Sequence, residues 1–174
     1  GTDIVMDISG RIANACPGYV SAPGELGSPP DIEANISPIE ESSNGVVVVD
    51  GSIPGPEVGL LRAPVTMTVC DGAIVDMEGP ADIVSIVRSM FAAIGSPKAY
   101  ILTECGVGMN DLAQLRGIML TDEGTAGTMH FGFGSNITVG GLNDVPFHHD
   151  FVFYAPTLSV DEEYLLIDGK VADS

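Results

Sequence analysis

Short apolar runs separated by glycine and proline dominate the chain and predict many strands and few helices. The 174 residues include 22 glycines and 12 prolines, so uninterrupted segments are short. We expect strands at Asp3–Ile8, Ile32–Ser37, Gly45–Asp50, Pro64–Cys70, Ala73–Glu78, Lys98–Glu104, Thr128–Gly134, Pro146–Ala155 and Tyr164–Asp168.

Two Asp-Gly pairs indicate hairpins between these runs. Asp71-Gly72 separates two β-type segments, and Asp168-Gly169 repeats the arrangement near the C-terminus. Asp-Gly suits the two-residue turns of hairpins because both central positions need positive φ. With strands outnumbering helices, we expect an α+β fold with a mixed or antiparallel sheet.

One amphipathic helix is predicted over about residues 80–95. Pro80 suits the first turn, and Gly95 with Pro97 beyond it marks the end. Apolar residues at helical spacing form its buried stripe: Ile83, Val87, Met90, Phe91 and Ile94. A second, shorter helix is expected at Asn110–Arg116.

Composition and charge narrow the function classes. Asp and Glu number 24 against 6 Lys and Arg, giving a net charge of −18. Nucleic acids and anionic membranes need a basic surface, so neither is an expected partner. The chain has the length of one domain, and its three cysteines favour reduced, buried thiols over disulfides. No secretory signal is visible, and we expect a cytoplasmic location.

The segment 146–154 carries two of the three histidines. On a strand, alternate side chains share a face, so His148 lies with Asp150. His-x-Asp can supply two ligands to one metal ion, or the Asp can simply accept a hydrogen bond from the His. His149 falls on the other face with Phe147 and Phe151 and favours a core or interface position.

Three further residues are candidates for the same chemistry. On the strand 128–134, His130 points away from the apolar face and needs a polar partner or an ion. Glu104 ends an apolar run and opens a Gly-rich stretch, a common position for a site residue and also for a loop cap. Glu33 alternates with apolar neighbours and is either a site residue or part of an ordinary solvent face.

In their order along the chain, these residues resemble the motifs of the thermophilic metallo-aminopeptidases, the leucyl aminopeptidase-type group around aminopeptidases T and S. The similar segments are Gly1-Thr2-Asp3 with Gly10-Arg11, Pro30-x-x-Glu33-x-x-x-x-Pro38-x-Glu40, Glu104-Cys105-Gly106-Val107-Gly108-Met109-Asn110, Asp122-Glu123 with Gly127-Thr128-Met129-His130, and His148-His149-Asp150. The likeness extends from residue 1 to about residue 169. It implies that the whole chain, 1–174, is a metal-binding catalytic domain, the C-terminal one of a longer architecture.

The resemblance implies a metal-dependent aminopeptidase that hydrolyses peptide N-termini with a metal-activated water. The implied ligands are Glu33, Glu104, His130, His148 and Asp150. Two Zn, Co or Mn ions would be held, with Glu123 or Glu40 as the base. A homodimer is also expected.

Two alternatives remain open. The dihydroxypyridine ring-opening dioxygenases are similar, keep the His-x-Asp, and use a single Fe(II). In that case His148, Asp150 and His130 would be the iron ligands, with Glu104 and Glu33 outside them. The other alternative is a non-catalytic domain that dimerises.

Overall fold

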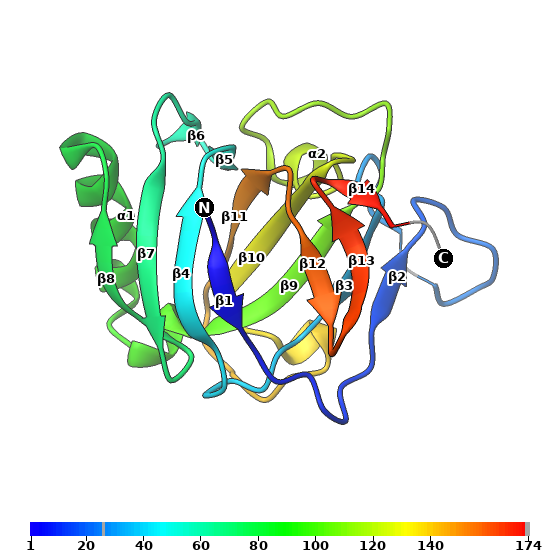
Figure 1. Cartoon of the computed structure of the whole chain (residues 1–174), viewed down its shortest axis with the longest axis horizontal. Helices are drawn as coiled ribbons and strands as arrows, with labels where there is room; N and C mark the ends of the chain where they lie inside the picture. Colours follow the sequence, from blue (N-terminus) through cyan, green and yellow to red (C-terminus); the bar gives the residue numbers. More distant parts are fainter. Residues whose placement is uncertain (26, 173–174) are drawn as a thin grey trace.

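The computed structural model describes residues 1–25 and 27–172, which form two large sheets and a smaller ribbon (Figure 1). The seven-stranded sheet has the order β2-β3-β9-β10-β11-β5-β6: Asn14–Cys16, Glu33–Ile36, Leu102–Gly108, Thr128–Gly134, His148–Tyr154, Ser52–Ile53 and Gly59–Leu60. The four-stranded sheet has the order β1-β4-β7-β8: Asp3–Val5, Asn44–Val49, Val65–Cys70 and Ala73–Glu78. The ribbon comprises β12 (Leu158–Val160), β13 (Glu163–Ile167) and β14 (Lys170–Val171).

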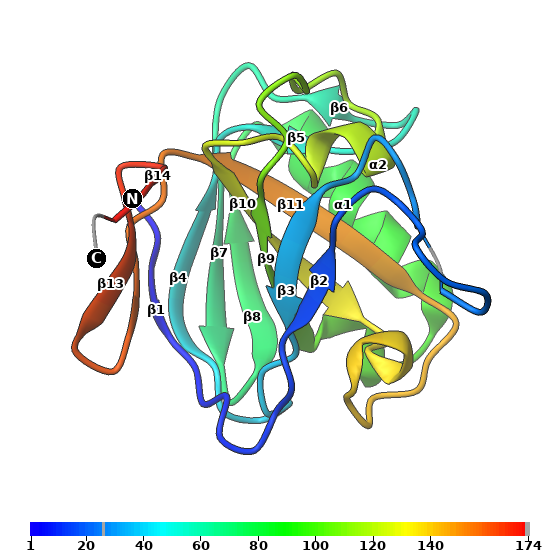
Figure 2. The same ribbon diagram turned by 90° about the vertical axis from the view of Figure 1, so that its right-hand side faces the viewer.

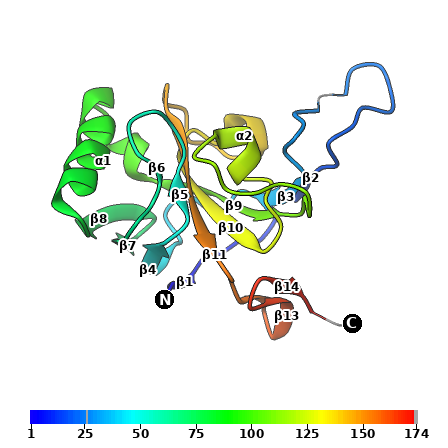
Figure 3. The same cartoon turned by 90° about the horizontal axis from the view of Figure 1, so that it is seen from above.

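All pairings between these strands are antiparallel. The helices are α1 (Ala81–Ile94) and the single turn α2 (Met119–Asp122), with 3₁₀ turns at Pro97–Tyr100 and Ile137–Val139. The α+β expectation is confirmed. Seen from above, α1 lies beside β7 and β8 at one end, and β13 and β14 project from the other side (Figure 3).

The core fills the space between the apolar face of the larger sheet, the four-stranded sheet and α1 (Figure 2). Phe91 of α1 stacks on Phe151 of β11 with ring centroids 6.0 Å apart, and meets Phe133 of β10 edge-on at 6.3 Å. Val47 and Met67, from β4 and β7, are fully buried against this group. These aromatic contacts anchor β10 and β11, the two strands that carry all the histidines.

The helix predicted over 80–95 is confirmed at Ala81–Ile94. Val87 and Phe91, from the predicted stripe, are its buried residues. Gly95 ends it with φ 67°, a left-handed conformation that suits glycine. Both Asp-Gly turns are confirmed as well: they join β7 to β8 and β13 to β14, with positive φ at both residues of each pair.

Three local predictions are wrong. Residues 97–100 form a 3₁₀ turn, because the Ser96 hydroxyl accepts from the Lys98 backbone N–H and caps it. The strand begins later and continues through the Gly-rich stretch to Gly108, so Glu104 lies inside β9. Residues 110–116 form no helix, since the Asn110 side chain accepts from the Leu112 N–H in a turn; the helix falls at Met119–Asp122.

All three thiols are free, but Cys105 alone is buried, whereas Cys16 is half-buried and Cys70 exposed. Among the described residues, no helix has the length and apolar character needed to cross a bilayer.

Candidate metal centre

Four neighbouring strands, β3, β9, β10 and β11, put acids, imidazoles and glycines on one face of the larger sheet. In the strand register, Gly132 of β10 lies between Glu104 of β9 and Asp150 of β11. The opposite face of these strands belongs to the core. The polar face contains Glu33, Glu104, Gly106, Gly108, His130, Gly132, His148 and Asp150.

Two of these glycines make the space that the imidazoles occupy. A Cβ on Gly106 would lie 2.1 Å from Nε2 of His130, and a Cβ on Gly132 would lie 2.8 Å from Nε2 of His148. Neither distance is compatible with a side chain. The glycines therefore let both rings lie over the sheet, close to the carboxylates of the adjacent strands.

The first group of potential ligands is Glu104, His148 and Asp150. The Nε2 atom of His148 lies 3.2 Å from Oε2 of Glu104 and 3.3 Å from Oδ1 of Asp150. One ligand atom from each residue lies within 4.8 Å of the other two. Glu104 and Asp150 are buried, whereas the His148 side chain is 32% exposed, so the group opens to solvent at His148.

The second group is Glu33, Glu104 and His130, and it shares Glu104 with the first. The Nε2 atom of His130 lies 3.1 Å from Oε2 of Glu33 and 4.0 Å from Oε1 of Glu104. All three side chains are buried. The two oxygens of Glu104 thus face different imidazoles, the arrangement of a carboxylate that can bridge two ions.

The donor atoms fit a divalent cation. Ligand atoms about 2.1 Å from a common ion lie roughly 3.0–3.4 Å apart in tetrahedral or octahedral geometry, which matches the distances around His148. Oε2 of Glu33 and Oδ1 of Asp150 are buried and make no hydrogen bond, although each lies near an imidazole nitrogen. Buried carboxylate oxygens without a donor are costly, and a cation would satisfy both.

Neighbouring groups orient the ligands. Nδ1 of His148 lies 2.7 Å from the Ser135 carbonyl oxygen, which can only accept a hydrogen bond. The proton therefore sits on Nδ1, and the lone pair of a neutral His148 is on Nε2, toward Glu104 and Asp150. The Asn35 side chain donates to Oε1 of Glu33 at 2.5 Å and leaves Oε2 free.

The pKa values show how the charges balance without a cation. Burial works to lower the pKa of His148, but the close carboxylates of Asp150 and Glu104 outweigh it and raise the pKa to about 11. Burial likewise opposes the charged form of Asp150, yet the adjacent His148 imidazolium and the nearby His130 charge hold the pKa of Asp150 well below its usual range. Protonated imidazoles therefore supply the positive charge that a bound cation would replace.

Glu123, predicted as a base, lies next to this centre. Burial, followed by the charge of Asp150, raises the pKa of Glu123 to about 9. Asp31 was not singled out from the sequence, although it precedes Glu33 by two residues. Burial and the Glu33 charge raise the pKa of Asp31 to about 6.

Glu40, the other predicted base, makes its contacts elsewhere. It forms an ion pair with Arg11 at 2.5 Å and accepts from Asn136 and from the Leu142 backbone N–H. Burial would raise the pKa of Glu40, but these hydrogen bonds and the Arg11 charge lower it overall. The contacts of Glu40 join three loops, and the structure does not bring it together with the two ligand groups.

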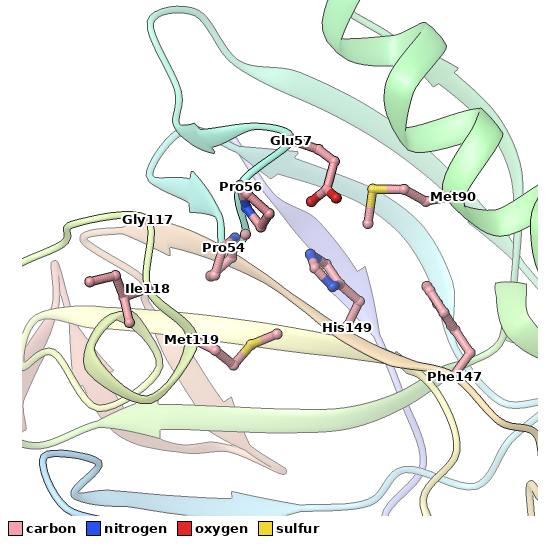
Figure 4. Close-up of a pocket in the computed structure, with 10 residues that line it drawn as sticks. Pro54, Pro56, Glu57, Met90, Gly117, Ile118, Met119, Phe147 and His149 are labelled. Atoms are coloured by element: carbon pink, nitrogen blue, oxygen red, sulfur yellow. The ribbon is translucent and has the colours of Figure 1, made fainter.

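The five predicted ligands converge on one face of the larger sheet. The iron ligands expected from the sequence are His148, Asp150 and His130, whereas the structure groups Glu104 with His148 and Asp150. His130 and His148 belong to different groups, and Glu104 completes the group of His148 and Asp150. His149 lies on the other face, as expected, against Phe147 and Phe151. There it lines an apolar pocket with residues of the β5–β6 segment, α1 and α2 (Figure 4); the residues drawn include Pro54, Glu57, Met90 and Met119.

Known proteins share this architecture. The model of the family described as NicX, 2,5-dihydroxypyridine 5,6-dioxygenase, matches residues 1–173. No curated protein matches the chain. The structure of 2,5-dihydroxypyridine dioxygenase from Pseudomonas putida KT2440 aligns with a TM-score of 0.85 and 21% identity, covering 99% of this chain and 55% of that one.

A second solved structure has the same fold. Wild-type AmpT from Thermus thermophilus aligns with a TM-score of 0.74 and 19% identity, covering 99% of this chain and 48% of the other. The chain thus spans about half the length of each solved structure. At these identities the likeness shows a shared fold.

Proposed function

We propose a function that starts from the family: this chain belongs to the NicX family of 2,5-dihydroxypyridine 5,6-dioxygenases. In this proposal the chain carries the iron centre of a dioxygenase, an enzyme that opens a dihydroxylated pyridine-type ring. This proposal reverses the order of the two enzymatic functions expected from the sequence. The reason is that the family match extends over nearly the whole chain.

The observation that carries the proposal is the group of Glu104, His148 and Asp150. One imidazole and two carboxylates converge there, at separations that fit a single ion. These three residues would hold Fe(II), for which imidazole and carboxylate ligands are suitable. When bound, the iron supplies the redox chemistry through which O₂ reacts with the ring.

The protein's own residues prepare this site for a small polar substrate. Ser135 fixes the tautomer of His148, and Gly132 leaves the space above the sheet in which the imidazole lies. The exposed edge of His148 is the side from which a ring could approach the buried carboxylates. Glu123 holds a proton beside Asp150 and could exchange it with a ring hydroxyl.

A two-metal aminopeptidase is the second candidate, and the group of Glu33, Glu104 and His130 favours it. Two-metal hydrolases place their ions about 3.5–4 Å apart and often share a carboxylate between them. Glu104 has the position for that bridge. In this case two Zn, Co or Mn ions would be held, and their positive charge would lower the pKa of Glu123, so that its carboxylate could accept the proton of a water.

Metal counting together with two activity assays distinguishes the candidates. Metal-free protein would be titrated anaerobically with Fe(II), and separately with Zn²⁺, and then assayed for O₂ uptake with 2,5-dihydroxypyridine and for amine release from an aminoacyl anilide. We expect one tightly bound iron per chain and substrate-dependent O₂ uptake. Two tightly bound zinc ions with amine release and no O₂ uptake would overturn the dioxygenase in favour of the hydrolase.

Two adjacent histidines give a matched pair of variants. His148→Ala removes a proposed ligand, whereas His149→Ala changes the neighbouring residue on the opposite face of the same strand. We expect His148→Ala to abolish tight iron binding and His149→Ala to keep it. Equal iron content in both variants would contradict the proposed ligand set.

A further inference from the structure

A third group of metal-ligating side chains lies beside the two already described. Cys16, Asp31 and Glu33 each offer one ligand atom, and these atoms lie within 4.8 Å of one another. Cys16 ends β2 and pairs directly with Glu33 of β3. Directly paired residues of antiparallel strands project from the same face, so the thiol lies on the face that carries the metal centre.

The carboxylates of this group have free, buried oxygens. Asp31 is 3% exposed; its Oδ2 accepts from the Ser28 hydroxyl at 3.0 Å, and its Oδ1 is buried without a partner. Oε2 of Glu33 is also buried without a hydrogen bond. Cys16 is only half-buried, so an ion has access to the group from solvent.

The donor set selects the kind of ion. Thiolate ligands favour Zn²⁺ and other soft or borderline cations, whereas Mg²⁺ and Ca²⁺ take oxygen ligands. Three protein ligands with one open position are enough for a tetrahedral zinc ion.

We propose that Cys16, Asp31 and Glu33 form an additional site for a thiophilic divalent cation such as Zn²⁺, adjoining the metal centre through Glu33. On binding, the Cys16 thiol releases its proton to solvent and the sulfur coordinates the ion. Because Glu33 also belongs to the group with Glu104 and His130, an ion at the additional site competes for that carboxylate. The site is independent of which reaction the metal centre catalyses.

Cadmium titration tests the site, because a cadmium–thiolate bond gives a charge-transfer band in the ultraviolet and cadmium bound to carboxylates or imidazoles does not. Reduced, metal-free full-length chain would be titrated with Cd²⁺. Cys16→Ser would be compared with Cys70→Ser, which replaces an exposed thiol on β7. We expect a band that saturates at one cadmium per chain in the wild type and in Cys70→Ser, and no such band in Cys16→Ser.

Two further variants separate this proposal from the iron centre. Asp150→Ala removes a ligand of the first group only, and we expect it to retain the cadmium band. Asp31→Asn should retain the fold by circular dichroism and bind cadmium at least tenfold more weakly. A band that persists in Cys16→Ser, or no band in the wild type at saturating cadmium, would overturn the additional site whatever the result for iron.

Discussion

Two glycines leave the space in which the imidazoles of His130 and His148 lie close to the carboxylates of the site. Gly106 and Gly132 lie on β9 and β10, directly against the rings of His130 and His148. Neither has a positive φ, so an alanine would be tolerated by the backbone and would act through its Cβ. The two positions can therefore be used to disturb each ligand group separately.

Gly132→Ala should displace His148 and Asp150, because its Cβ would lie 2.7 Å from Cε1 of His148 and 2.9 Å from Oδ1 of Asp150. We expect at least a tenfold loss of affinity for the first bound iron, measured by titration of the metal-free protein. Gly106→Ala is the matched variant, since its Cβ meets His130; it should affect the first iron less. The reverse ranking would show that the first ion binds at His130.

Glu40→Gln tests whether this residue acts as a base or joins loops. We expect a loss of about 1 kcal/mol in the free energy of unfolding at pH 7, because the substitution removes the ion pair with Arg11 and weakens hydrogen bonds. The iron-dependent activity of the folded variant should be unchanged. Loss of activity without loss of stability would instead indicate a catalytic role.

The effect of Glu40→Gln on the free energy of unfolding should depend on pH in a predictable direction. The pKa of Glu40 is lower in the folded protein than its ordinary value. Its stabilising contribution is therefore complete above that ordinary value and is lost as the pH falls through the folded pKa. The difference in unfolding free energy between the wild type and Glu40→Gln should shrink from pH 7 to pH 3; a constant difference would contradict the assignment.

At the scale of elements, the site depends on the register of four antiparallel strands. Shifting one strand by a single residue would move its polar side chains to the core face and its apolar ones to the polar face. The phenylalanines of β10 and β11 resist such a shift, since they pack into the core around Phe91. The apolar face thereby fixes the register that aligns the ligands on the other face.

The buried Asp122 side chain connects three elements by hydrogen bonds: α2, the loop that precedes it, and β5. It is fully buried and accepts from the Ser52 hydroxyl at 2.6 Å and from the backbone N–H groups of Arg116 and Gly117 at 2.7 and 2.8 Å. Asp122→Ala should cost about 3 kcal/mol, because these buried donors lose a charged acceptor. Urea unfolding measures the loss, and Asp111→Ala, at an exposed position, should change stability by less than about 0.5 kcal/mol.

For the whole molecule, the net charge of −18 and the buried carboxylates both favour cation binding. An ion that binds only the folded state stabilises it by about 2.7 kcal/mol at a concentration one hundred times its Kd. We expect Fe(II) to raise the thermal midpoint of the wild type and to leave that of a folded Asp150→Ala variant nearly unchanged. An equal rise in both proteins would place the stabilising ion outside the proposed centre.

The sequence by itself determined the elements whose reasons are local. Alternation along 128–134 and 148–154 assigned each histidine to the correct face, Asp-Gly pairs set two hairpins, and a helical stripe between Pro80 and Gly95 set α1. These features depend on side-chain periodicity and backbone conformation within a few residues. The family motifs in turn selected the five residues that converge.

Only the tertiary structure decided how those residues are grouped. His130 and His148 lie on adjacent strands, but each belongs to a different ligand group, because the two oxygens of Glu104 face different imidazoles. No spacing along the sequence predicts this grouping. The pairing of β2 with β3 places Cys16 beside Glu33, Asp31 lies close to both, and Glu40 contacts Arg11 and Asn136 instead. The physical reason is that ligand geometry depends on the register between strands distant in sequence, and packing of the whole core sets that register.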